Sequence, residues 1–259
     1  MSKLLERALA TRTSMGATSL AFKVYLILGF ELAVLYGCTF FVIQQCQKAF
    51  YANKTFLGIA FVEAVNPNRQ IDICIVQSKA TTLFFFWFIL FAIISMWTAT
   101  AFIIFSSSFI QFIFMTISAI FYGSVIGFII MDMDENDGMT GLKGATLTTA
   151  AMFVLVSVSG INFANGIFVS TVASLIIMLI TWELIALVRG ISRGAQKIKA
   201  VMGIITFSMS LLASISMVNV SSDQGLNDWN TAIDLAFGMY LDIINIILYF
   251  ITISMSWYF

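Results

Sequence analysis

Seven apolar stretches recur along this 259-residue chain, and they constrain its fold more than any other feature. A helix needs about 20 predominantly apolar residues to cross the hydrocarbon core of a bilayer. With 60% hydrophobic and 10% charged residues, the composition is also far from that of a soluble domain. The sequence therefore predicts an all-α polytopic membrane protein with seven transmembrane helices in a single membrane domain. These helices are expected at residues 24–43, 81–105, 109–131, 144–161, 166–188, 199–218 and 232–256.

The connections between these stretches are mostly short. Residues 44–80 form the long exception, contain the only proline, Pro67, and are expected to be an extramembrane or interfacial loop. The acidic segment 132–139, DMDENDGM, is predicted to be a polar hairpin rather than an EF-hand calcium loop, because its glycine is one position late. Basic residues flank both the first stretch and several later loops, so the positive-inside tendency leaves the orientation open.

Composition excludes several function classes. The chain has no histidine, which removes Ser-His and Cys-His catalysis and every histidine-ligated metal site. The formal net charge is zero without a long basic tract, so no nucleic-acid partner is expected. An intramembrane aspartyl protease needs paired acids, and the GxGD motif of that class is absent. We expect neither an enzyme nor a bound cofactor.

Asp242 lies deep within the last apolar stretch. An acid at mid-depth costs about 2.5 to 3.5 kcal/mol on insertion scales, so such acids usually face a protein interior or an ion pathway. Helical spacing places Gly238, Asp242, Asn245 and Tyr249 on one stripe of this helix. Two interpretations stay open: Asp242 handles a cation or proton, or it only joins two helices through a hydrogen bond.

Other acids lie in or near apolar stretches. Glu31 and Glu183 are within them, and Asp234 is near the start of the last one. All 13 Lys and Arg residues fall in loops or at the ends of the stretches, which predicts that no buried cation neutralises these acids. Proton or cation handling is therefore the leading chemistry. Glu31 and Glu183 are favoured as local polar contacts, whereas Asp234 is about 12 Å from Asp242 along the helix and suits a successive ion station.

The sixth stretch has its own polar stripe. Gly203, Ser210, Ser214 and Met217 share one helical face there. Small residues on such a face allow close helix packing. We interpret this stripe mainly as a packing surface.

The C-terminal segment has a recognisable motif, GMYLDIINIILYF, which resembles the signature of the transmembrane Bax inhibitor motif family. Weaker similarities to the family's first, third and fourth spans follow in order: AFKVYLILGFELAVLYG, FYGSVIGFII and ATLTTAAMFVLVSVSG. This resemblance implies a seven-helix fold in which the last helix is central and the other six wrap around it. It also implies a pH-sensitive calcium leak, which in eukaryotic members accompanies restraint of cell death.

In that family an aspartate on the last helix pairs with one near the end of the sixth. Asp242 matches the first of these positions, whereas Val218 and Asn219 occupy the region expected for the second. Asp223 lies one turn further along and is a candidate replacement. The family's basic residue on the second span is also missing, since residues 81–105 contain no Lys or Arg.

The expected function is a pH-modulated calcium leak channel or exchanger. Asp242 is its predicted ion and proton site and the one place where calcium is expected, without a firm metal-binding motif. Its predicted neighbours are Asn219, Asp223, Asp234 and Asn245. The alternative is a non-transporting regulatory protein with membrane-protein partners, in which Asp242 only locks the helix bundle. Either protein is integral to the lipid bilayer, and an excess of Phe and Ile with one proline suits the inner membrane of a bacterium with an AT-rich genome.

Overall fold

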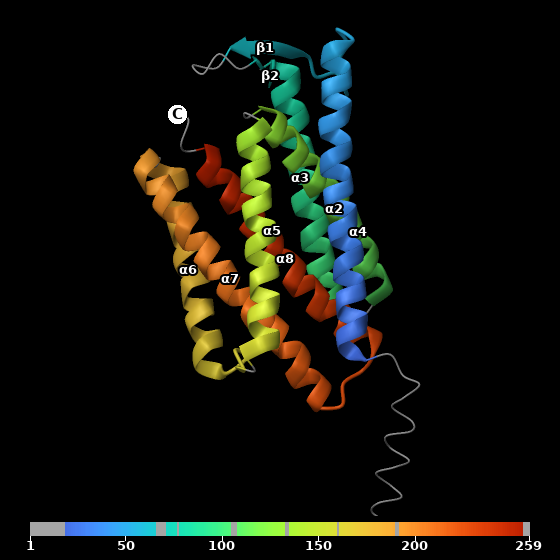
Figure 1. Ribbon diagram of the computed structural model, residues 1–259, viewed down its shortest axis with the longest axis vertical. Coiled ribbons are helices and arrows are strands. Elements are labelled where there is room, and N and C mark those ends of the chain that lie inside the picture. Colours follow the sequence, from blue (N-terminus) through green and yellow to red (C-terminus); the bar gives the residue numbers. More distant parts are fainter. Residues whose placement is uncertain are drawn as a thin grey trace, which may run out of the picture.

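The computed structural model describes residues 19–65, 71–76, 78–104, 108–132, 135–159, 161–189 and 192–255. These residues form long helices and one short hairpin (Figure 1). In chain order the elements are α2 (Leu20–Tyr51), β1 (Phe61–Val65), β2 (Ile71–Ile75), α3 (Lys79–Ile104), α4 (Ser108–Asp132), α5 (Glu135–Ser159), α6 (Gly166–Arg189), α7 (Arg193–Asp223) and α8 (Trp229–Met255).

Six of these helices are long and apolar enough to cross a membrane, counting only the described residues. The six are α2 and α4 to α8, while α3 contributes a shorter apolar helix at Thr81–Phe91. The predicted all-α, polytopic membrane protein is therefore confirmed.

Several helices extend past their apolar stretches. Helix α2 continues to Tyr51, and α7 covers 193–223 rather than 199–218. The polar headgroup layers add roughly 10 to 15 Å to the thickness of the apolar core, so a helix can continue beyond its apolar part. The polar hairpin predicted at 132–139 is wrong, because α5 already begins at Glu135. Acidic residues in a first helical turn are favourable there, since they face the positive end of the helix dipole.

The predicted loop 44–80 contains regular structure. After the end of α2, β1 and β2 pair in antiparallel register, with Phe61 opposite Ile75. The Ile75 amide donates a hydrogen bond of 3.1 Å to the Asp132 carboxylate at the end of α4. The hairpin therefore lies against one end of the helices, beside the C-terminal end of α2 (Figure 1).

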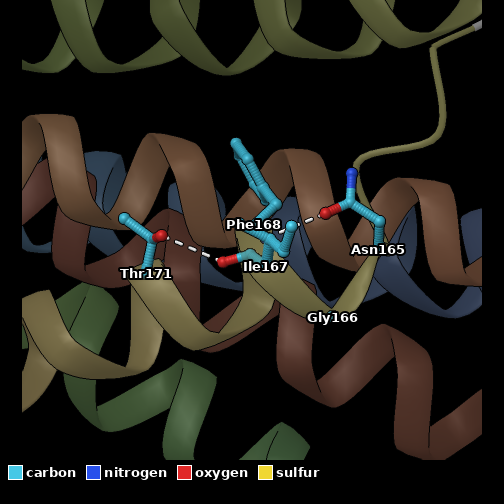
Figure 2. A pocket seen from close by; sticks show the side chains of 5 residues that line it. All are labelled: Asn165, Gly166, Ile167, Phe168 and Thr171. Atoms are coloured by element: carbon cyan, nitrogen blue, oxygen red, sulfur yellow. Dashed lines mark hydrogen bonds between the residues drawn. The ribbon is translucent and has the colours of Figure 1, made fainter.

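Polar side chains cap the starts of several helices. The Ser19 hydroxyl accepts a hydrogen bond from the Phe22 amide at 3.3 Å, and Ser192 caps α7 in the same way. Figure 2 shows Asn165 accepting from the Phe168 amide at 2.8 Å at the start of α6. An apolar hollow lies beside this cap, lined by Asn165, Gly166, Ile167, Phe168 and Thr171. None of these side chains is titratable, so this hollow offers no acid–base chemistry.

Asp228 caps the start of α8 and provides a first testable prediction. Its carboxylate accepts hydrogen bonds from the Thr231 amide and the Thr231 hydroxyl, each at 2.8 Å, and these bonds lower the pKa of Asp228. A lowered pKa in the folded state means that the stabilisation is present above the ordinary aspartate pKa and is lost as the pH falls through the lowered value. Asp228→Ala should therefore unfold at a lower temperature than the wild type near neutral pH, and the gap should close on acidification. Thermal unfolding in detergent across that range tests this, with Asp223→Ala as the exposed-acid control; a gap that persists in acid would contradict it.

Helix α8 lies among four of its neighbours. It packs against α2, α4, α5 and α7, whereas α3 packs on α4 and α6 on α7. Of the six candidate spans, α8 has the largest buried share, at 56%, and α6 the smallest, at 12%. Helix α8 is therefore the most enclosed of these six helices.

Glycines permit the closest helix contacts. A Cβ atom at Gly123 of α4 would overlap the Leu35 carbonyl oxygen of α2, and one at Gly127 would lie 2.8 Å from the Thr39 carbonyl oxygen. The Thr39 hydroxyl donates a hydrogen bond of 2.9 Å to the Gly123 carbonyl oxygen. This is the close backbone approach that small residues spaced by four allow between membrane helices.

Candidate functional site

The candidate site lies at the interface of α7 and α8. Gly203 of α7 contacts the Tyr249 ring, and the Phe207 ring stacks on Tyr249 with centroids 5.9 Å apart. Further along α7, Ser214 meets Asp242. Residue numbers rise along α7 while they fall along α8, so the helices form an antiparallel hairpin. This register determines which α7 side chains face Asp242.

Asp242 is only 6% exposed and faces two serines of α7. The Ser214 hydroxyl donates a hydrogen bond of 3.2 Å to Oδ2, and Ser210, one turn earlier, also bonds the carboxyl group. No charged side chain of the described residues acts on Asp242. The carboxyl group is therefore held by neutral hydroxyls alone. The serine stripe interpreted as a packing surface thus also supplies the hydrogen-bond partners of Asp242.

The structure does not bring Asn219 or Asp223 to Asp242. Both side chains are exposed, and Asp223 is the last residue of α7. The antiparallel register places Ser210 and Ser214 at the level of Asp242, and Asn219 lies about 7.5 Å further along the helix axis than Ser214. Asn245 donates its amide to the Leu241 carbonyl oxygen at 2.8 Å, within its own helix.

Asp234 does not join this site either. Asp234 is exposed on α8, where Gln111 of α4 lies nearby. Glu183 is within α6, but its side chain lies outside the described residues.

Glu31 is fully buried between α2 and α4. From the sequence, only a local or interfacial polar contact was favoured for this side chain. The Thr116 hydroxyl lies 2.7 Å from its Oε1 atom, whereas Oε2 has no hydrogen-bond partner. A single acid in an apolar stretch does not reveal this burial, because it depends on how neighbouring helices pack.

One basic residue, Lys23, is buried among the helices. This side chain is only 7% exposed at the start of α2. Its ammonium group donates a 2.6 Å hydrogen bond to the Asn227 carbonyl oxygen and lies 5.2 Å from the Trp229 ring centroid. A long lysine stem buries its methylenes easily while its charged end finds polar partners. Lys23 thus joins α2 to the start of α8. It lies eight residues before Glu31 in the sequence and neutralises none of the predicted acids.

Neither Asp242 nor Glu31 belongs to a cluster of metal ligands. Among the described residues, no three His, Cys, Asp or Glu side chains gather closely enough to hold a metal ion. A calcium ion normally takes 6 to 8 oxygen ligands, often with several carboxylates. A cation at Asp242 would therefore have one carboxylate and neutral oxygens around it.

Comparison with known proteins adds no relative. No family model, curated protein or solved structure matches this chain.

Proposed function

We propose that this protein is a pH-modulated cation leak channel or exchanger, with calcium as the carried ion and Asp242 as the ion and proton site. The observation that carries the proposal is a buried carboxyl group on α8 whose partners are two serine hydroxyls of α7. A buried carboxylate without a cationic neighbour takes up a proton, accepts hydrogen bonds from neighbouring helices or attracts a mobile cation.

The serine partners suit both states of Asp242. A hydroxyl group can donate to an ionised carboxylate or accept from a protonated one. When the pH is low, a proton removes the charge that attracts the cation. When the pH is higher, the carboxylate offers a negative site with hydroxyl oxygens beside it. Protonation of one group would therefore modulate cation passage.

We further propose a seven-span bundle of the Bax inhibitor type with α8 at its centre. The C-terminal motif around Asp242 supports this, as do the direct contacts of α8 with α2, α4, α5 and α7. In this proposal Asn219 occupies the region of the family's second aspartate. The pair of aspartates that the resemblance implies is therefore not formed there. The membrane is proposed to be the inner membrane of a bacterium.

Calcium flux into liposomes that contain the purified protein tests the proposal. An interaction between unit charges about 4 Å apart is worth about 4 kcal/mol at an effective dielectric constant near 20. Asp242→Asn removes that attraction while preserving shape, so we expect flux to fall by about tenfold or more. The pH dependence between about pH 6 and 8 should also disappear.

Asp234→Asn is the matched control, because it makes the same change at an exposed acid of the same helix. It should keep both the flux and its pH dependence. Flux that survives unchanged in a folded Asp242→Asn variant would refute the proposed site.

One observation favours a second function. The bond from Ser214 to Asp242 joins α7 to α8, which is what a structural lock in a non-transporting partner of other membrane proteins would require. In that case no flux above empty liposomes appears at any pH, and Asp242→Asn only lowers the unfolding temperature.

A further inference from the structure

A second group of buried polar side chains lies where α2, α4 and α8 meet. Glu31 comes from α2, Thr116 and Ser118 from α4, and Tyr240 from α8. The side chains of Glu31, Ser118 and Tyr240 are all fully buried. Because Tyr240 precedes Asp242 by two residues, it points roughly 200° away around the helix, so this group lies on the other side of α8 from the Asp242 site.

The Thr116 hydroxyl group contacts two oxygen atoms but has only one proton. Its hydroxyl oxygen lies 2.7 Å from Glu31 Oε1 and 3.0 Å from the Phe112 carbonyl oxygen. A threonine hydroxyl has one proton to donate, yet both neighbours are acceptors when Glu31 is ionised. Both contacts become hydrogen bonds if Thr116 donates to Phe112 and Glu31 donates its own proton to Thr116. A proton on Glu31 therefore gives each of the two contacts its own hydrogen.

Ser118 and Tyr240 contribute two further buried hydroxyl groups to this region. Tyr240 lies next to Ser118 and within electrostatic range of Glu31. Glu31 Oε2 itself is buried without a hydrogen-bond partner. Unpartnered buried polar atoms are rare and call for an explanation. A hydroxyl group that turns toward Glu31 would supply the donor that its ionised form lacks.

No charged side chain of the described residues competes for this carboxyl group. Besides Glu31, the titratable groups that interact electrostatically with Tyr240 are Tyr122 of α4 and Cys38 of α2. Lys23 is on the same helix as Glu31, but about 12 Å away along the axis. Asp242 faces α7, and α8's other acid, Asp234, is exposed.

We propose that Glu31 is a proton-binding site in the core of the bundle, separate from Asp242, with Thr116 as the partner of its protonated form and Ser118 and Tyr240 as the partners of its ionised form. On release, the O–H bond of Glu31 breaks and the proton passes to water. Thr116 then donates to Oε1, and Ser118 and Tyr240 donate to Oε2. This site does not depend on whether the protein carries calcium.

Infrared spectroscopy of the full chain in lipid vesicles tests the site. A protonated carboxyl group has a carbonyl stretching band distinct from that of a carboxylate. In an Asp242→Asn background we expect one such band near neutral pH, and it should be absent when Glu31→Gln is added. In that background, a band that survives unchanged in Glu31→Gln, or the lack of any band before Glu31 is changed, would overturn the proposal. Since flux is not measured, failure here is distinguishable from failure of the proposed calcium leak.

Tyr240→Phe tests the hydrogen bond proposed between Tyr240 and ionised Glu31. Loss of a hydrogen bond to the charged form should move the disappearance of the Glu31 band to higher pH by about one to two units. Tyr249→Phe is the matched control, because Tyr249 lies on the same helix but faces α7. An equal shift in both variants, or none in either, would contradict the assigned role of Tyr240.

Thr116→Val keeps the test decisive if Glu31→Gln does not fold. It removes the hydroxyl group that contacts Oε1 and leaves Glu31 in place. The carbonyl band should then shift in frequency, and an unshifted band would overturn the assignment of the proton to this pair.

Discussion

Gly123→Ala is expected to destabilise the protein by about 3 kcal/mol or more, at the upper end of the cost of overpacking. The new Cβ atom would overlap the Leu35 carbonyl oxygen, which belongs to the backbone of α2 and cannot rotate away. Movement of α4 away from α2 would also lengthen the hydrogen bond from Thr39 to the Gly123 carbonyl oxygen. Chemical unfolding in detergent measures the effect.

Gly37→Ala is the matched control for this substitution. Gly37 lies on α2, two residues after Leu35, but a Cβ atom there would meet nothing within 4 Å. Alanine is favoured over glycine in a helix by about 1 kcal/mol, so this variant should be neutral or more stable than the wild type. If both variants have the same stability as the wild type, α4 does not approach α2 at Gly123.

The sequence was sufficient for the membrane class and for the general positions of the helices. Apolar stretches of the right length are a one-dimensional signal, so α2 or α6 can be found without knowing any neighbour. Their ends were less predictable, because a helix does not stop where its apolar residues stop. The start of α5 at Glu135, within an acidic segment, illustrates this.

The surroundings of each buried acid were not predictable in the same way. Helical periodicity placed Asp242 on a polar stripe, but the identity of its partners depends on the register between α7 and α8. The expected spacing favoured Asn219, whereas the register selects Ser210 and Ser214. For Glu31, three helices distant in sequence supply the environment, and no local pattern encodes their meeting.

A second large effect is expected at the interface that positions Asp242. A Cβ atom at Gly203 would lie 2.5 Å from the Tyr249 ring, which stacks on Phe207. Gly203→Ala should therefore destabilise the protein by about 1 to 3 kcal/mol. Tyr249→Leu alone should cost about 0.5 to 1.5 kcal/mol through lost aromatic stacking.

The double variant distinguishes this contact from a general loss of packing. With Tyr249 replaced by leucine, the aromatic ring that the new Cβ atom would overlap is gone, so the cost of Gly203→Ala should largely vanish. The two substitutions should then couple by about 2 kcal/mol, whereas distant sites add to within about 0.5 kcal/mol. The register that sets Gly203 against Tyr249 also sets Ser214 against Asp242, so the cycle tests the geometry of the candidate site without altering it. Simple additivity of the two substitutions would mean that α7 and α8 meet in another register and that Asp242 has other partners.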